Sequence, residues 1–181
     1  MAESSLTKRA LAGAMKTLMA SRPFQKINVG DVCELCQMNR KSFYYHFRDK
    51  YDLVNWIFQT EFIAVMQEKK PDSYWEMVEQ LCAYFYENRA FYRNALSVEG
   101  QNSFREYFQE VLAPVLQGLM DSEFAPNTPE SDFLVTFYSD ALTAALIRWL
   151  SSRNCQKPGD FTAMLRLCVE ATAQKFSGNE T

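Results

Sequence analysis

The sequence has little histidine and little glycine, and both shortages count against an enzyme. Of its 181 residues one is histidine, His46, and six are glycine. A single histidine excludes a metal site built from several histidines of one chain, and any catalytic triad that needs histidine would have to use this one. Six glycines do not readily build a phosphate-binding loop, and the motifs G-x-G-x-x-G, G-x-S-x-G and H-E-x-x-H are absent. We therefore expect no enzyme activity, no cofactor and no metal.

Long apolar runs are also lacking. No stretch approaches the roughly 18 consecutive apolar residues that cross a membrane, and the best one, residues 141–150, contains Arg148. Near the N-terminus, Lys16 interrupts the apolar stretch that a signal peptide would need. The five cysteines are odd in number and scattered, which favours reduced core residues over a disulfide framework. These features predict a cytoplasmic protein without a membrane partner.

Cys33 and Cys36 form a C-x-x-C motif, which admits a zinc or redox interpretation. A zinc ribbon needs a second such pair, and a thioredoxin-like site needs strands and helices in alternation. The sequence offers neither, so we expect both cysteines to pack in a core.

The net charge of −3 conceals an uneven distribution. Residues 1–50 hold nine Lys/Arg against four Asp/Glu, a net charge of +5, whereas residues 51–181 hold ten against eighteen, a net charge of −8. A basic end on an acidic protein is typical of a module that binds a polyanion, although such an excess is also common by chance.

Apolar residues recur with helical spacing along the whole chain, and strand-like alternation is absent. The pattern predicts helices at 6–20, 29–36 and 40–47, with Ser5, Asn28 and Asn39 as N-caps, and a long helix from Lys50 that Asp49 caps. Further helices are expected at about 73–89, 91–99, 102–120, 131–153 and 160–176. The predicted fold class is all-α.

The two short helices at 29–36 and 40–47 leave room only for a tight turn between them, which predicts a helix-turn-helix. On the second helix, Phe43 and Phe47 lie four residues apart and share one apolar face. The rest of that helix carries two cations, a hydroxyl, two phenols and an imidazole. Such a surface suits contacts to bases and phosphates in the major groove.

The segments Ile27–Val32, Asn39–Phe47 and Asp49–Leu53 resemble the DNA-binding domain of TetR-family transcriptional regulators, including its Tyr-Tyr-His-Phe and Lys-x-x-Leu elements. The resemblance covers residues 6–62. One departure is Gln37, which stands where the family usually has a turn glycine. A left-handed backbone at a non-glycine residue would cost about 1–2 kcal/mol, which the fold can tolerate.

The resemblance implies which residues bind DNA. Arg40, Lys41 and Ser42 match positions that read base edges, and Arg40 is the best candidate for paired hydrogen bonds to guanine. Contacts to phosphates are implied for others. The implied DNA-binding set is Asn28, Asn39, Arg40, Lys41, Ser42, Tyr44, Tyr45, His46 and Lys50. The alternative for each is a solvated or capping side chain, and for Tyr44 and Tyr45 a place in the core.

The resemblance also implies a homodimer built from the last two helices, whose apolar residues cover more than one face. Two recognition helices would then bind a near-palindromic double-stranded DNA operator. The expected interface residues are Phe133, Phe137, Ala141, Ala145, Trp149, Met164 and Cys168. Burial of these side chains within one chain is the alternative.

The resemblance implies a three-helix DNA-binding domain at 1–50, a linking helix at 50–68 and a regulatory and dimerisation domain at 69–181. Aromatic residues of the regulatory part could line a pocket for a small-molecule effector, or could equally fill the core. The candidates are Phe62, Trp75, Phe85, Phe104 and Phe108. Repression relieved by an effector is the default expectation.

The segment Tyr45–Trp56 and the short C-terminal part look especially like regulators associated with dihydroxyacetone kinase. In that branch a protein co-regulator can carry the signal, and the outcome can be activation of transcription. This is the alternative to repression, and an enzyme is a distant third.

Overall fold

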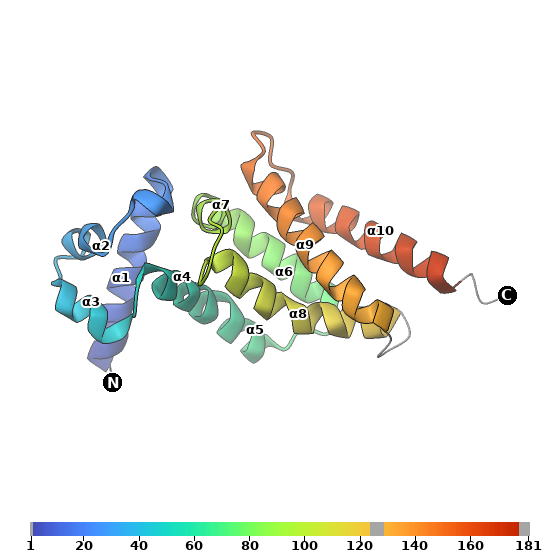
Figure 1. The fold of residues 1–181 in the computed structure, drawn as a ribbon, viewed down its shortest axis with the longest axis horizontal. Coiled ribbons are helices and arrows are strands. Elements are labelled where there is room, and N and C mark those ends of the chain that lie inside the picture. The colour runs from blue at the N-terminus through green and yellow to red at the C-terminus, as the bar shows by residue number, and fades with distance from the viewer. Residues whose placement is uncertain (1, 124–128, 178–181) are drawn as a thin grey trace. The chain divides into compact units, whose positions relative to one another are not determined.

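The computed structural model describes residues 2–123 and 129–177, and within these ranges all regular structure is helical (Figure 1). This confirms the predicted all-α class. The α-helices are α1 (Ala2–Ser21), α2 (Val29–Leu35), α3 (Arg40–His46), α4 (Lys50–Phe58), α5 (Ala64–Lys69), α6 (Tyr74–Glu87), α7 (Arg89–Leu96), α8 (Phe104–Glu123), α9 (Pro129–Ser151) and α10 (Pro158–Ser177). A 3₁₀ turn, η1 (Phe24–Lys26), follows α1, and a π-helical turn, η2 (Gln59–Ile63), joins α4 to α5.

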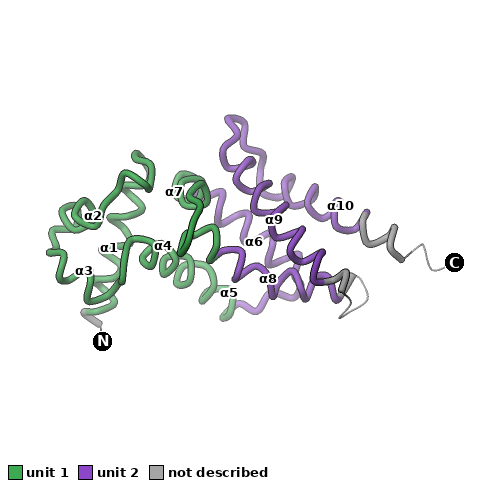
Figure 2. Tube along the Cα trace, in the orientation of Figure 1, with its two compact units in different colours: residues 1–68, 90–107 green, residues 69–89, 108–181 purple. Residues whose placement is uncertain are grey.

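The helices form two compact units, drawn in different colours in Figure 2. The first comprises residues 1–68 and 90–107, and the second comprises residues 69–89 and 108–181. Most of α7 and the first turn of α8 therefore pack with the N-terminal helices, although they come later in the sequence. Helix α8 contributes residues to both units.

Three of the predicted N-caps are confirmed. The Asn28 side chain accepts a hydrogen bond from the Asp31 N–H (3.1 Å), and the Asp31 carboxylate accepts one from the Asn28 N–H (2.9 Å), which makes a capping box. Asn39 Oδ1 accepts from the Ser42 N–H at 2.8 Å. Asp49 Oδ1 accepts from the two N–H groups at the start of α4.

The predicted cap at Ser5 is wrong, because α1 begins at Ala2 and Ser5 is an exposed residue inside the helix. Apolar spacing marks the buried face of a helix and not its first exposed turn, so the sequence pattern placed the start too late.

Helix α10 begins at Pro158, two residues before the predicted start at residue 160. Pro158 and Gly159 belong to the first turn of α10, where proline costs little because its missing N–H would have no helical partner. Helix α9 likewise begins at Pro129.

The core of the first unit forms where α1 packs on α2, α3 and α4. Phe43 and Phe47 of α3 and its cap are fully buried there, as the apolar-face argument predicted. The π-helical turn lies in the long helix after α4, and Gln59 accepts a hydrogen bond from the Tyr107 hydroxyl (2.7 Å). The sequence pattern did not predict this turn, because apolar spacing does not distinguish one wide turn within a long helix.

In the second unit α6 packs along α10. Phe85 and Phe108 are buried against each other with ring centroids 5.4 Å apart. The guanidinium of Arg89, the first residue of α7, donates to the carbonyls of Leu150 and Ser152 at the end of α9. These contacts give the unit a core of its own.

Candidate nucleic-acid interface

The turn between α2 and α3 is a Schellman motif built without glycine. The Met38 N–H donates to the Cys33 carbonyl at 2.8 Å, and the Gln37 N–H donates to the Glu34 carbonyl at 3.1 Å. Gln37 has a φ of 55°, so the left-handed conformation considered from the sequence is present. This turn fixes the direction in which α3 leaves α2.

Helix α3 has the two faces that a recognition helix needs. Phe43 is fully buried, and Phe47 packs edge-on against Trp56 with ring centroids 5.6 Å apart. On the opposite side Tyr44 is 57% exposed and Tyr45 is 82% exposed, so neither belongs to the core. The remaining predicted contacts on this helix, Arg40, Lys41, Ser42 and His46, are exposed or partly exposed. The helix thus offers cations and hydroxyls to solvent along one surface.

The Arg40 side chain lies across the first turn of α2. A Cβ added at Gly30 would lie 2.6 Å from Arg40 Nη2 and 2.8 Å from Asn28 Oδ1, so the guanidinium occupies space that only glycine leaves open. Asn28, Asn39 and Arg40 all border the same shallow depression between the two helices. Asn28 and Asn39 use their side-chain oxygens for capping and are exposed.

The Lys50 side chain points back to its own chain and contacts backbone carbonyls. Its ammonium donates to the carbonyls of Ile27 (2.7 Å) and Phe24 (2.9 Å), with Gln25 at 3.5 Å, and lies 4.4 Å from the centre of the Phe24 ring. Burial lowers the pKa of this ammonium from its usual value. The sequence placed Lys50 among phosphate contacts, whereas in the structure it holds η1 against the start of α4.

Sequence reasoning missed Asn94 on α7. Its amide donates to the carbonyls of Met19 and Arg22, and its Oδ1 accepts from the Phe24 N–H. The end of α1 and the start of η1 therefore find partners on a helix 70 residues later in the chain. No local pattern signals such a contact, because asparagine in a helix is ordinarily a neutral surface residue.

The two cysteines of the C-x-x-C motif lie in α2 and at its C-cap. Cys33 is buried, and the half-buried Cys36 donates its thiol to the Val32 carbonyl at 3.2 Å. Burial is the main cause that raises the pKa of both thiols, so they stay protonated at neutral pH. This fits the packing interpretation of the C-x-x-C motif.

Most residues expected at a dimer interface lie on the surface of α9 and α10. Phe133 is 68% exposed and Phe137 53% exposed, and their rings stack 6.1 Å apart. Ala141, Met164 and Cys168 are exposed, and Ala145 is half-buried. Residues 132–151 are long and apolar enough to cross a membrane by length and composition, yet only 28% of that window is buried in the chain. A helix that is apolar over residues 132–151 and mostly unburied in its own chain is unusual for a monomer.

Trp149 differs from the other expected interface residues because it is buried in its own chain. Its ring stacks on Phe161 at 4.4 Å, and its Nε1 donates to the Gln156 carbonyl at 3.0 Å. Sequence spacing placed it on the interface stripe, but the loop between α9 and α10 folds over it. The side chain contributes to folding of the second unit.

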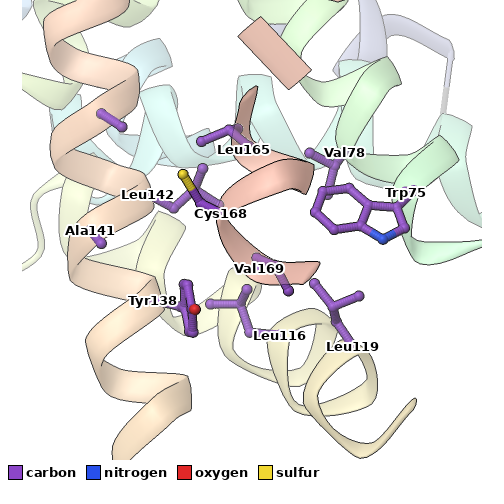
Figure 3. A pocket seen from close by; sticks show the side chains of 11 residues that line it. Trp75, Val78, Leu116, Leu119, Tyr138, Ala141, Leu142, Leu165, Cys168 and Val169 are labelled. Atoms are coloured by element: carbon purple, nitrogen blue, oxygen red, sulfur yellow. The ribbon is translucent and has the colours of Figure 1, made fainter. Parts of the chain in front are cut away.

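The five aromatic residues suggested for an effector pocket are divided between the two units. Phe62 and Phe104 pack with Phe58 in the first unit, whereas Phe85 and Phe108 fill the core of the second. Trp75 alone of the five lines a cavity of about 190 Å³ in the second unit, between α6, α8, α9 and α10 (Figure 3).

Two family models match this chain. Residues 10–57 match the tetR family of bacterial regulatory proteins, and residues 72–170 match a transcriptional regulator C-terminal region. The chain belongs to the TetR family: it is a DNA-binding transcriptional regulator and not an enzyme.

Individual relatives agree with this assignment. The chain is 24% identical over 156 residues to the HTH-type dhaKLM operon transcriptional activator DhaS of Lactococcus lactis, covering 86% of this chain and 79% of that protein. A solved structure of a DhaS matches with a TM-score of 0.68 and 20% identity, covering 93% of this chain and 96% of that one.

Two further solved structures share the fold. A TetR regulator from Streptococcus agalactiae matches with a TM-score of 0.74 and 23% identity, over 93% of this chain and 96% of that one. RolR in complex with resorcinol matches with a TM-score of 0.56 and 19% identity, over 98% and 95%. At these identities the structural matches establish the fold.

Proposed function

We propose that this chain binds a near-palindromic operator as a homodimer and inserts α3 into the major groove. The observation that supports this most strongly is the division of α3 into two faces, with Phe43 and Phe47 buried and the cationic and phenolic side chains exposed. Arg40, Lys41 and Ser42 read base edges, and Tyr44, Tyr45 and His46 hold phosphates. The exposed caps Asn28 and Asn39 contribute at the edge of the interface.

In this proposal Lys50 supports DNA binding indirectly, because it holds η1 in place and does not contact DNA. Its ammonium is committed to the carbonyls of Phe24 and Ile27 (2.9 and 2.7 Å), so it fixes η1 and, with it, the position of α2. Residues 1–50 form the DNA-binding domain, residues 50–68 link it, and residues 69–181 carry regulation and dimerisation. Residues 90–107 pack in one unit with residues 1–68.

The proposed dimer uses the exposed apolar surface of α9 and α10. Phe133, Phe137, Ala141, Met164 and Cys168 lie at its centre, and Ala145 lies between the helices. Covering this surface with a second copy would remove apolar area from water, which is the main driving force for association. A two-fold dimer presents two α3 helices to successive major grooves.

For the sign of regulation, the first candidate is repression. The dimer on its operator blocks polymerase and so represses transcription, and the dimer is released from DNA when an effector binds the regulatory part. The solved complex of RolR with resorcinol supports a small-molecule effector. A second candidate is activation controlled by a protein co-regulator, which the printed role of DhaS as a transcriptional activator favours. Both candidates place the protein in the cytoplasm, without a membrane partner.

The experiment is selection of bound DNA from a random pool by the full chain, followed by titration of salt on the selected site. We expect a near-palindrome and an affinity that falls steeply with salt. Arg40→Ala should lose about 1–3 kcal/mol of discrimination at one base pair of each half-site. An unselective pool, or unchanged specificity in Arg40→Ala, would refute the base-reading role. A reporter gene behind the selected site then separates repression from activation.

A further inference from the structure

Lys8 of α1 lies at the C-terminal end of the recognition helix α3. Its ammonium is 5.6 Å from the centre of the Phe47 ring and 5.6 Å from the centre of the Trp56 ring. Phe47 is the C-cap of α3, and α1 packs against α3 (Figure 1). A cation at this distance from two aromatic rings is attracted by both. The rings therefore hold the ammonium beside the end of α3.

The charge of Lys8 has no partner in the protein. Within the described part of the chain its ammonium forms no ion pair and no hydrogen bond, and the side chain is partly exposed. Lys16, further along the same helix, is instead neutralised by Glu61 at 2.6 Å. Lys50 is occupied by backbone carbonyls. The Lys8 ammonium thus remains available to an anion from outside the chain.

Two donors of α3 lie at the same end of that helix. The His46 ring is 6.5 Å from the Phe47 ring, and the Tyr45 ring is 4.9 Å from the His46 ring. Tyr45 is 82% exposed, and His46 is partly exposed. An ammonium, an imidazole N–H and a phenol O–H near one another suit a phosphate, whose oxygens accept several hydrogen bonds at once.

The alternative for Lys8 is a purely structural role. Two aromatic rings and the negative end of a helix dipole would attract a cation whether or not DNA is bound. In that case removal of the charge would change the stability of the fold and would leave the salt dependence of DNA binding as it is. The two roles therefore predict different measurements.

We propose that Lys8 forms, together with Tyr45 and His46, a binding site for one DNA phosphate at the C-terminal end of α3 in each subunit. The inference rests on the proposed function, in which Tyr45 and His46 hold phosphates. It adds a residue of α1 to the DNA contacts and supplies the positive charge that the inward-pointing Lys50 does not offer. The sequence did not indicate Lys8, because no local pattern connects α1 with the end of α3.

The first test compares Lys8→Met with Arg9→Met in the full chain on a selected operator. Methionine keeps an apolar stem over the two rings and removes the charge. Arg9 is the matched control, because it is the next residue of α1, is exposed, and contacts no ring and no acid among the described residues. Lys8→Met should flatten the plot of log affinity against log salt by about 0.9 for each half-site, whereas Arg9→Met and Lys8→Arg should keep the slope.

An unchanged slope in Lys8→Met would overturn the proposal. Equal flattening in Arg9→Met would overturn it as well, because the effect would then belong to the total charge of α1 and not to a site. Urea unfolding checks that each variant is folded, and we expect the same midpoint for Lys8→Met as for the unchanged chain. Lys8→Gln is a second neutral variant, from which the same flattening is expected.

A second test asks whether Lys8 and Tyr45 contact the same phosphate. One uncharged methylphosphonate replaces each phosphate of a half-site in turn. The unchanged chain should bind about fivefold more weakly when the phosphate of this site is the neutral one. In Lys8→Met and in Tyr45→Phe this loss should shrink, and at the same position. A loss that shrinks at different positions in the two variants would overturn the shared site.

Failure of the proposed function would look different. If the unchanged chain selected no operator from a random pool, the proposed function itself would be refuted. An operator that is selected, and that Lys8→Met binds with the salt slope and the methylphosphonate profile of the unchanged chain, would refute the phosphate site alone.

Discussion

Asn94 Oδ1 accepts a hydrogen bond from the Phe24 N–H at 2.8 Å, across 70 residues of sequence. The same amide donates to the carbonyls of Met19 (3.0 Å) and Arg22 (2.6 Å). Both the nitrogen and the oxygen of the amide are therefore used to connect α7 with the point where α1 ends and η1 begins. A shift of α7 would reach the helix-turn-helix through this contact.

Asn94→Ala should lower the free energy of unfolding by about 1–3 kcal/mol, because two carbonyls and one N–H lose their partner in a partly buried place. Operator affinity should fall with it. The matched control is Ser97→Ala on the same helix, whose exposed hydroxyl bonds only locally, to the Asn94 carbonyl. Urea denaturation and gel shift measure the two effects, and equal stability of both variants would contradict the role assigned to Asn94.

Lys50→Met keeps the apolar stem and removes the ammonium from the carbonyls of Phe24 and Ile27. We expect a loss of about 1–3 kcal/mol in unfolding free energy and an unchanged dependence of operator affinity on salt. A phosphate contact predicts the opposite pair of results: unchanged stability and a salt slope that is flatter by about one. Thermal unfolding together with a salt titration therefore separates the two roles.

Gly30→Ala tests the position of Arg40. Alanine should stabilise a helix by about 0.5–1 kcal/mol over glycine, but a Cβ at this place would displace the guanidinium and the capping oxygen of Asn28. We expect little gain in stability and altered discrimination at the base pair that Arg40 reads. Gly13→Ala in α1, where a Cβ meets open space, is the control and should be more stable with unchanged specificity. Identical operator preferences in both variants would argue against this placement of Arg40.

Gln37→Gly should raise the free energy of unfolding by about 1 kcal/mol, because the left-handed backbone of the turn penalises a side chain. The hydrogen bonds of the turn do not involve the Gln37 side chain, so operator affinity should stay within twofold. Denaturation and gel shift are the measurements. A less stable glycine variant would mean that the glutamine side chain contributes more than the strain costs.

Phe137→Glu places a charge on the exposed surface of α9, and we expect dimers to dissociate at micromolar concentration in sedimentation while the monomer stays folded. Phe137 suits this test better than Trp149, because substitution of Trp149 would remove a ring stacked on Phe161 inside one chain. Glu79→Gln, exposed on α6, is the control. A dimer that persists in Phe137→Glu would place the interface elsewhere.

The N-terminal helices were predictable because their signals are local. Asn28, Asn39 and Asp49 cap the helices that follow them, and each cap needs only an oxygen two or three residues before an N–H group. The apolar pair Phe43 and Phe47 likewise fixes the buried face of α3 by spacing alone. These features give the helix-turn-helix before any long-range contact is known.

Three assignments needed the tertiary structure. Whether Lys50 reaches outward or inward depends on where η1 lies, and the spacing that put Trp149 on an interface stripe could not show the loop that covers it. That Trp75 lines a cavity depends on how four helices pack in the second unit. The partners of a long flexible side chain or a buried ring depend on which residues lie near it in the folded chain. Helical periodicity in the sequence does not encode these long-range neighbours.

The sequence by itself determined an all-α chain, a basic helix-turn-helix at its start and the family to which it belongs, because these rest on helical periodicity, caps and a dense local motif. The tertiary structure alone decided that α7 packs with the N-terminal helices, that Asn94 and Lys50 fasten the turn before α2, and that an uncharged cavity forms in the second unit. The physical reason is that burial and desolvation, which decide whether a polar group is paired or free, are properties of the packed chain.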